Sequence, residues 1–323
     1  MNILVTGGAG YIGSHIVKTL GERGFNIVVY DNLSKGHRDA VLYGKTIIAD
    51  LANAQLLDTI VGDFKPDAVM HFAAFIEVGE SVKDPIKYYW NNVANTINLM
   101  HVLSKHGVNK FIFSSSAAVY GNPLKVPIPE TEPIKPINPY GQSKAIIEDI
   151  LYDMSAMSDF RFVSLRYFNA AGADPSRRIG ERHDPESHLI PLILKTAQGK
   201  QKCLTIYGSD YPTPDGTCIR DYIHVNDLAE AHLLALDHLL DNGKSDIFNC
   251  GYGHGYSVQN VVEVAKKVTG TDFAVQVKDR RPGDSPVLVA DSSKLKQILR
   301  WKPNYDDVEY IVRTAWEWEK LQK

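Results

Sequence analysis

Residues 2–13 read Asn2-Ile3-Leu4-Val5-Thr6-Gly7-Gly8-Ala9-Gly10-Tyr11-Ile12-Gly13. An apolar run leads directly into glycines, and apolar residues at helical spacing follow them. This order is typical of a strand, a tight turn and a helix. The glycines at 8, 10 and 13 match the dinucleotide fingerprint, and those at 7, 10 and 13 match a spaced variant of it. Because glycine lets the backbone approach a pyrophosphate and a helix N-terminus favours an anion, the stretch predicts a nucleotide-binding turn.

A second apolar run, residues 26–30, ends at Asp31, about 20 residues after the glycines. A carboxylate at this place binds both hydroxyls of an adenosine ribose and repels a 2′-phosphate, which favours NAD over NADP. Lys35 and Arg38 follow closely and weaken this preference. The alternative is a glycine turn that only packs a strand on a helix, and the presence of Asp31 argues against it.

Strands and helices alternate through the first half of the chain. We expect strands at 46–49, 67–72, 110–113 and 162–166, and helices at 54–61, about 85–106 and 140–157. Strands separated by helices imply right-handed crossovers and a parallel sheet. Ligands of such sheets bind at the carboxyl ends of the strands. Those ends are predicted at Gly7, Asp31, Asp50, Ala73 and Ser116.

The second half of the chain changes character. Residues 169–221 are rich in glycine, proline, arginine and histidine, which suggests loops that fold over a cleft. A helix at 225–240 and a strand at 247–250 are expected to return to the first domain. The predicted fold class is therefore α/β, a doubly wound parallel sheet of Rossmann type at 1–168, with return of segments in 223–250. A smaller α+β substrate-binding domain is predicted at 169–323.

Composition narrows the function classes. The chain has 323 residues and a net charge of −3, so no basic field points to nucleic acid. No apolar stretch is long enough to span a bilayer, and the first residues resemble a strand rather than a signal segment. Three scattered cysteines suggest neither a metal pair nor a disulfide framework, and we expect a cytoplasmic protein. The histidines at 183–188 fit no usual zinc spacing, so we expect a solvated loop and no metal.

Tyr140 and Lys144 are four residues apart in a predicted helix, so both fall on one face. A cation beside a phenol favours the phenolate, and we expect the pKa of Tyr140 to fall from about 10 toward neutrality. The serines Ser114, Ser115 and Ser116 lie upstream, where a hydroxyl can hydrogen-bond the same substrate oxygen. Taken alone, the pair fits a surface tyrosine beside a solvated lysine. The nucleotide-binding turn, the serines and the proline that starts the helix before Tyr140 reverse that interpretation.

With these residues the chain resembles the extended short-chain dehydrogenase/reductase family, and within it the enzymes that invert C4 of UDP-hexoses. The similarity covers nearly the whole chain. The motifs that carry it lie at 7–14, 31–33, 78–81, 88–93, 113–116, 139–144, 166–169, 207–213, 215–217, 220–224 and 280–284. Agreement by chance over so many dispersed motifs is negligible.

The resemblance implies a reaction. Tyr140 is the catalytic base, Lys144 lowers its pKa and holds the nicotinamide ribose, and Ser116 bridges Tyr140 and the sugar 4-hydroxyl. NAD is the implied cofactor, and UDP-glucose and UDP-galactose are the implied substrates, with UDP-GlcNAc and UDP-GalNAc as further candidates. C4 is oxidised to a transient 4-keto sugar, the sugar turns about its pyrophosphate link, and hydride returns to the opposite face. The net redox change is zero.

The resemblance also implies contact sets and a partner. Besides the three catalytic residues, the implied cofactor contacts are Gly7, Gly10, Tyr11, Ile12, Gly13, Asp31, Asn32, Asp50, Leu51, Phe72, Ala73, Ala74, Asn91 and Phe168. Besides Ser116 and Tyr140, the implied substrate contacts are Asn169, Leu189, Thr205, Tyr207, Arg220, Tyr222, Arg281, Asp284 and Leu288. Family members pair two subunits through helices that match 85–106 and 140–157, so we expect a homodimer.

Three positions depart from some family members. Ile76 stands where some carry a lysine near the cofactor pyrophosphate, and the loss of that cation is expected to weaken NAD retention. Leu288 stands where some carry a bulky tyrosine, and a smaller side chain leaves room for an N-acetyl group. His188 stands where another member has asparagine, and no role follows from it.

Alternative functions stay open. A nucleotide-sugar dehydratase or decarboxylase needs an extra acid and base, and the positions that carry them in related dehydratases are Ala117 and Ala118 here. Alanine moves no proton, so dehydration is disfavoured. An epimerase of UDP-glucuronate would need a cation or dipole for the C6 carboxylate. A non-catalytic NAD-sensing protein typically lacks the tyrosine or the lysine, and both are present.

Overall fold

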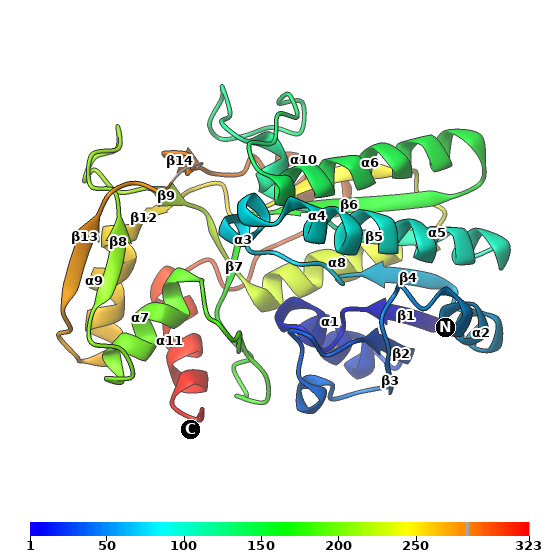
Figure 1. The fold of residues 1–323 in the computed structure, drawn as a ribbon, viewed down its shortest axis with the longest axis horizontal. Helices are drawn as coiled ribbons and strands as arrows, with labels where there is room; N and C mark the ends of the chain where they lie inside the picture. Colours follow the sequence, from blue (N-terminus) through cyan, green and yellow to red (C-terminus); the bar gives the residue numbers. More distant parts are fainter. Residues whose placement is uncertain (282–283, 323) are drawn as a thin grey trace.

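The computed structural model describes residues 1–281 and 284–322, which include a seven-stranded parallel sheet in the order β11-β6-β5-β4-β1-β2-β3 (Figure 1). The strands are β1 Asn2–Thr6, β2 Asn26–Asp31, β3 Lys45–Ile48, β4 Ala68–His71, β5 Lys110–Ser114, β6 Arg161–Tyr167 and β11 Asp246–Cys250. The four strands predicted at 46–49, 67–72, 110–113 and 162–166 are found with ends shifted by no more than one residue. The predicted parallel sheet is confirmed.

Helices cover both faces of the sheet, because successive residues of a strand point to opposite sides. Ile3 and Val5 of β1 are fully buried in one core cluster with Leu20, while Leu4 is buried in another with Leu99. The first face carries α1 Tyr11–Glu22 and α8 Val225–Leu240, and the second carries α2 Ala54–Phe64, α5 Asn95–Lys105 and α6 Pro139–Met157. The doubly wound Rossmann-type fold is therefore confirmed.

The sheet is completed by a segment from late in the chain. β11 pairs in parallel with β6, and Ile247 lies beside Ser164 in the register. The helix α8, which has the predicted limits 225–240, packs its apolar side with the core of the same sheet. The division of the chain at residues 168 and 169 into two domains stays a prediction.

The rest of the second half forms small sheets and helices, most of which Figure 1 shows to the left of the large sheet. Helices α7 Leu189–Ala197, α9 Val258–Thr269 and α11 Val308–Glu319 contribute to one apolar cluster. The short strands are β7 Asn169–Ala171, β8 Leu204–Tyr207, β9 Ile219–Arg220, β10 Tyr222–His224, β12 Tyr256–Ser257, β13 Val275–Lys278 and β14 Val287–Leu288, and α10 spans Ser293–Ile298. None of the described helices combines the length and apolar composition needed to cross a lipid bilayer.

The prediction of one continuous helix at about 85–106 is wrong, because the segment is divided into several helical elements. The structure has α3 Val78–Lys83, α4 Pro85–Tyr88, a π-helix at Tyr89–Ala94, and then α5. Within the π-helix, the Asn92 side chain accepts a hydrogen bond from the Phe75 backbone and donates to the Ser143 hydroxyl. Such tertiary bonds favour a local widening of the helix, which propensity does not report and which is frequent at functional sites.

Candidate active site

The glycine turn between β1 and α1 has room for a ligand only because side chains are absent. Gly7 has φ +72°, and a Cβ there would lie 2.4 Å from the Ala73 backbone nitrogen. A Cβ on Gly13 would lie 2.2 Å from the Gly7 carbonyl oxygen. Gly10 caps α1 without a side-chain hydrogen bond, which leaves the helix N-terminus open toward the turn. This cradle fits a pyrophosphate, as the glycine spacing predicts.

Asp31 links the segments that follow β1 and β2 at the same edge of the sheet. Its carboxylate is 8% exposed and accepts hydrogen bonds from the backbone of Ala9 at 2.9 Å and of Leu33 at 2.8 Å. Burial raises the pKa of Asp31, and the two backbone hydrogen bonds oppose that rise. The next side chain, Asn32, donates to the Asp50 carboxylate at 2.7 Å. The carboxyl ends of β1, β2 and β3 thus come together around acceptors suited to ribose hydroxyls.

A hollow of about 580 Å³ opens along these strand ends. Ten of the residues implied as cofactor contacts line it, namely Gly7, Gly10, Asp31, Asn32, Asp50, Leu51, Phe72, Ala73, Ala74 and Asn91. The other implied contacts, Tyr11, Ile12, Gly13, Ser116, Tyr140, Lys144 and Phe168, are not among the lining residues. The hollow adds Tyr30, Ser34, Lys35, Gly36, Ala49, Phe75 and Asn95. Tyr30 and Ala49 lie at the ends of predicted strands, and Ser34, Lys35, Gly36 and Phe75 follow such ends within a few residues, so extending the predicted sites along the chain would have found these six.

Tyr140 and Lys144 lie on the first turns of α6. The helix begins at Pro139, and the Asn138 side chain accepts a hydrogen bond from the Gly141 nitrogen at 2.9 Å. Tyr140 is 7% exposed and Lys144 is 2% exposed, so the interpretation as a surface tyrosine beside a solvated lysine is wrong. The helix therefore directs both groups into the protein, where their chemistry depends on what surrounds them.

The serines at the end of β5 meet this pair. Lys144 donates from Nζ to the Ser114 carbonyl oxygen at 2.6 Å. Ser116 accepts a hydrogen bond from the Ala118 nitrogen at 3.1 Å, which caps the short 3-10 helix Ala117–Tyr120. The Ser116 hydroxyl also lies near the Tyr140 phenol and lowers its pKa. The structure thus places the three predicted catalytic residues together.

The protonation of the pair differs from the expectation. Burial raises the pKa of Tyr140, and the hydrogen bond with Ser116 only partly offsets it. Burial also lowers the pKa of Lys144 to about 7, against an opposing effect of Glu148. Desolvation disfavours both the phenolate and the ammonium. The prediction that Lys144 brings the pKa of Tyr140 toward neutrality is therefore wrong for the protein's own groups.

A buried charge network behind Lys144 was not predicted. Glu148 lies one helical turn after Lys144 on α6 and accepts a hydrogen bond from Ser115 at 2.6 Å. Its carboxylate pairs with Arg166 at 2.5 Å, and both side chains are almost completely buried. Arg166 in turn donates to the Tyr120 hydroxyl at 2.9 Å. The spacing of four residues between Lys144 and Glu148 was the available signal, because it places the carboxylate on the same helical face.

The residues implied as substrate contacts form three small groups and two separate positions. Arg220 lies 3.6 Å from the Asp284 carboxylate, and Leu288 is its partner in the pairing of β9 with β14. The guanidinium of Arg281 lies 4.1 Å from the centre of the Tyr207 ring. The remaining members are Asn169 and Tyr222, which face each other in the β7–β10 register, Leu189 at the start of α7, and Thr205 in β8. Pro282 and Gly283 of the motif at 280–284 lie outside the described residues.

The expected solvated loop at 183–188 is found only in part, because Asp184, Pro185 and Ser187 are exposed whereas two other side chains are enclosed. The side chain of Glu186 is 3% exposed and that of His183 is 14% exposed. Glu181, just before the run, is 8% exposed and belongs to the same cluster. The sequence of the run is polar, and only the folded structure reveals that the side chains of Glu186 and His183 are enclosed.

The fold and the hollow at the strand ends together define a dinucleotide-dependent enzyme. Residues 3–251 match the NAD dependent epimerase/dehydratase family, and the chain belongs to that family. Its similarity to particular members extends over the whole chain. It is 51% identical over 320 residues to the UDP-glucose 4-epimerase of Halalkalibacterium halodurans, a match that covers 99% of this chain and 96% of that protein.

Solved structures agree with this assignment. The UDP-glucose 4-epimerase of Brucella ovis in complex with NAD superposes with a TM-score of 0.95 at 47% identity, covering 98% of this chain and 97% of that one. The UDP-Glc/GlcNAc 4-epimerase of Campylobacter jejuni superposes with a TM-score of 0.86 at 48% identity, covering 99% of each chain. The resemblance inferred from the motifs is confirmed.

Proposed function

We propose that this chain is an NAD-dependent epimerase that inverts C4 of a UDP-hexose and interconverts UDP-glucose and UDP-galactose. The observation that carries the proposal is the buried Tyr140–Lys144 pair beside Ser116, at the end of the strand next to those that form the dinucleotide hollow. The similarity to UDP-glucose 4-epimerases, which covers nearly the whole chain, supports UDP-hexoses as the substrate class.

NAD is the cofactor, and the residues present fit it. Gly7, Gly10 and Gly13 leave space for the pyrophosphate, and Asp31 offers acceptors for the adenosine ribose. Lys35 also lines the hollow, where it pairs with Glu77 at 3.2 Å, and we propose that this cation turns to the cofactor phosphates, since position 76 is isoleucine. When bound, NAD supplies a positively charged ring that takes a hydride from the sugar and gives it back.

The chain's own residues manage the proton. Tyr140 takes the proton of the sugar 4-hydroxyl while C4 is oxidised, and returns it when C4 is reduced from the opposite face. Ser116 lies near the Tyr140 phenol and orients the hydroxyl. Because burial raises the pKa of Tyr140, the phenolate needs positive charge close by, and the positively charged nicotinamide ring would supply it when NAD is bound.

We propose that the second half of the chain holds the UDP part and leaves the hexose free to turn. Arg220 and Arg281 are suited to a pyrophosphate because a guanidinium binds its oxygens in two-pronged fashion. Tyr207, stacked under Arg281, offers an aromatic surface for a base. Leu288 packs against the apolar cluster that contains Ala117 and borders Ser116. Its modest size leaves room for an N-acetyl group, which supports UDP-GlcNAc and UDP-GalNAc as further substrates.

Dehydration is less well supported. A dehydratase of this fold needs an acid and a base after the serine, and Ala117 is instead buried in an apolar cluster. No side chain at that position can carry a proton. A role as an NAD sensor is likewise disfavoured, since the catalytic pair is complete and enclosed.

We also propose a homodimer, a cytoplasmic location and the division into domains at 1–168 and 169–323. Several large apolar side chains are exposed along the segment from α3 to α5. They include Val82, Ile86, Trp90 and Ile97. Exposed apolar side chains that gather in one segment of the surface suit an interface with a second copy of the chain. Light scattering of wild type and of Trp90→Glu tests it, because a charge inside the interface should give monomers.

The decisive experiment uses purified protein and UDP-galactose without added cofactor. We expect product NMR to show equilibration with UDP-glucose. We expect Tyr140→Phe to lower the rate by about 10²–10⁴, the range for loss of a general acid–base. Tyr152→Phe, on an exposed part of the same helix, should keep the wild-type rate. Accumulation of a keto-deoxy sugar would indicate a dehydratase, and unchanged turnover by Tyr140→Phe would refute the proposed chemistry.

A further inference from the structure

Four metal-ligating side chains converge in the segment between β7 and α7. They are Glu181, His183, Glu186 and His188, and one ligand atom of each lies within 4.8 Å of the ligand atoms of the other three. His183 Nδ1 lies 3.1 Å from Glu181 Oε1, and the Nδ1 atoms of both histidines lie 3.8 Å from Glu186 Oε1. His188 Nδ1 also contacts Glu181 Oε1. The four groups therefore face a common point.

The hydrogen bonds within this cluster are incomplete. Glu186 Oε2 is buried and makes no hydrogen bond with any described residue, although the side chain is 97% enclosed. His183 Nδ1 is also buried, and its close approach to Glu181 lacks the alignment of a hydrogen bond. Leaving a buried carboxylate oxygen without a partner is costly, because its desolvation is uncompensated. This arrangement suits a bound ligand that would interact with the unpaired carboxylate oxygen and with the imidazole nitrogens.

We propose that Glu181, His183, Glu186 and His188 bind one divalent transition metal ion, with Zn²⁺ as the best-suited ion. Imidazole nitrogens and carboxylate oxygens are both zinc ligands, and four protein ligands fill a tetrahedral zinc site, in which the His188 side chain is 43% exposed. Ligand atoms around tetrahedral zinc lie about 3.3–3.6 Å from one another, so small side-chain rotations would complete the geometry. The two carboxylates neutralise the ion, and Glu186 Oε2 gains a partner.

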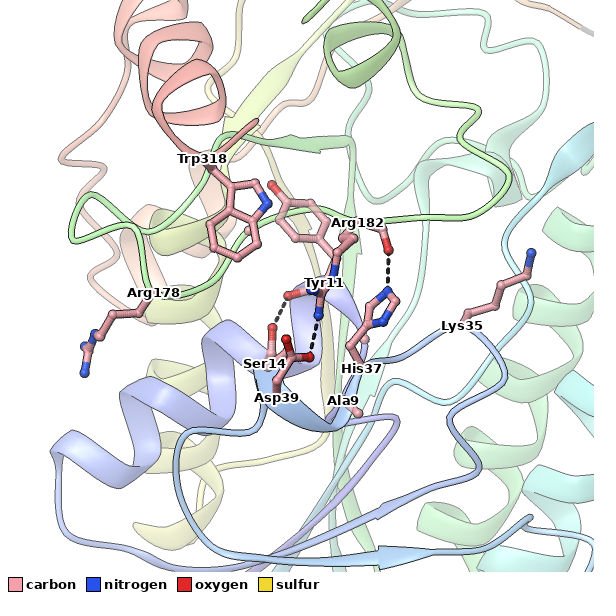
Figure 2. Close-up of a pocket in the computed structure, with 12 residues that line it drawn as sticks. Ala9, Tyr11, Ser14, Lys35, His37, Asp39, Arg178, Arg182 and Trp318 are labelled. Carbon is pink, nitrogen blue, oxygen red and sulfur yellow. Dashed lines mark hydrogen bonds and ion pairs between the residues drawn. The ribbon is translucent and has the colours of Figure 1, made fainter. Parts of the chain in front are cut away.

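The ion would stabilise a segment that contacts both halves of the chain. The Glu181 carbonyl accepts a hydrogen bond from Trp318 of α11 at 3.0 Å, and the Arg182 carbonyl is 2.8 Å from His37 Nε2. Figure 2 shows Trp318, Arg182 and His37 around a second hollow of about 330 Å³ next to Tyr11. On the other side, the cluster ends directly at Leu189, where α7 begins. The metal is thus structural, and it fixes a segment that lies between the dinucleotide hollow and the second half.

The test uses untagged full-length protein, stripped with a chelator and titrated with ZnCl₂ against a chromogenic zinc indicator at neutral pH. We expect one equivalent to bind. Glu186→Gln, which preserves shape, and His183→Ala should each weaken binding by more than the roughly 100-fold typical of a lost outer-shell partner. His254→Ala is the matched control, because His254 pairs with Asp306 at the surface away from the cluster and should leave binding unchanged.

Two further readouts do not depend on activity. Co²⁺ added to stripped wild-type protein should give visible d–d absorption of a tetrahedral site, and Zn²⁺ should raise the unfolding temperature of wild type but not of Glu186→Gln. The proposal is overturned if wild type binds no more Zn²⁺ than His183→Ala. It is equally overturned if NMR shows both imidazoles remaining protonated in the presence of Zn²⁺, since the cluster would then be two ion pairs. Because neither readout requires sugar turnover, failure of the metal proposal would leave the proposed epimerase function standing.

Discussion

Replacing Glu148 by glutamine tests whether a buried charge supports the catalytic helix. The Glu148 carboxylate lies 2.5 Å from Arg166 Nη2 and accepts a hydrogen bond from Ser115 at 2.6 Å. The two charged side chains are 3% and 6% exposed, so neither is compensated by water. Glutamine keeps the shape but removes the charge and turns one acceptor into a donor that faces the guanidinium. Arg166 would then be a buried cation without a counter-charge.

The magnitude follows from that burial. Breaking a buried ion pair by removing one partner costs about 3–5 kcal/mol of unfolding free energy. The matched control is Glu22→Gln, because Glu22 is 40% exposed where it meets Arg178. An exposed pair of this kind is worth about 0–1 kcal/mol. Adding Arg166→Met to Glu148→Gln should recover part of the lost stability, since it removes the orphaned charge.

Urea unfolding followed by tryptophan fluorescence measures these differences. We expect Glu148→Gln to lose at least about 2 kcal/mol more than Glu22→Gln, with the double variant in between. If the two single variants unfold with equal free energies, the buried pair does not stabilise the fold and the reasoning is refuted. A double variant less stable than Glu148→Gln would contradict the orphaned-charge argument in the same way.

The same substitution should change the pH dependence of the protein. The folded pKa of Lys144 is about 7, below the value of about 10.4 for an unfolded lysine. The unfolded chain therefore binds more protons between these values, so the contribution of Lys144 makes stability rise with pH across that window. Without Glu148 the folded pKa falls further, and the window extends to lower pH. We expect the alkaline limb of kcat/KM to move to lower pH as well, because the ammonium beside Tyr140 is lost earlier.

Three other substitutions have defined outcomes. Gly7→Ala should lower bound NAD per subunit strongly, because its Cβ would meet the Ala73 backbone, whereas Gly24→Ala has similar φ and open space and should retain NAD; equal retention would contradict the cradle. Lys35→Met should weaken NAD binding about tenfold, or about 1.4 kcal/mol. The control is Lys83→Met, which replaces an exposed lysine; if it weakened NAD binding as much, Lys35 would not make a specific contact. Leu288→Tyr should reduce kcat/KM for UDP-GalNAc relative to UDP-galactose, and an unchanged ratio would exclude Leu288 as the determinant.

The parts of the fold that sequence predicts well are those that local pattern controls. Residues 2–6 and 110–114 are short apolar runs bounded by turn signals, and buried parallel strands have this form. Their ends then place Gly7 and Ser116 at one edge of the sheet, because parallel strands share a direction. The return of β11 was also readable, since its apolar run follows a long amphipathic helix.

The parts that sequence missed depend on contacts between distant residues. The π-helix at 89–94 holds Asn92 against Phe75 and Ser143, and no helical propensity encodes those partners. The pairing of Glu148 with Arg166 joins α6 to β6 across the core. The enclosure of Glu186 depends on the segments packed over it, while its own sequence reads as solvated.

For Tyr140 and Lys144, sequence spacing predicts the placement of the side chains but not their protonation. A separation of four residues places Tyr140 and Lys144 on one face, and the structure confirms that placement. Spacing does not say how deeply the face is buried, and burial decides the protonation. It raises the pKa of Tyr140 and brings that of Lys144 to about 7, so the protein alone holds a protonated phenol beside an amine close to its titration point. We infer that Tyr140 becomes a base only when further positive charge enters the site, so proton removal is confined to the fully assembled complex.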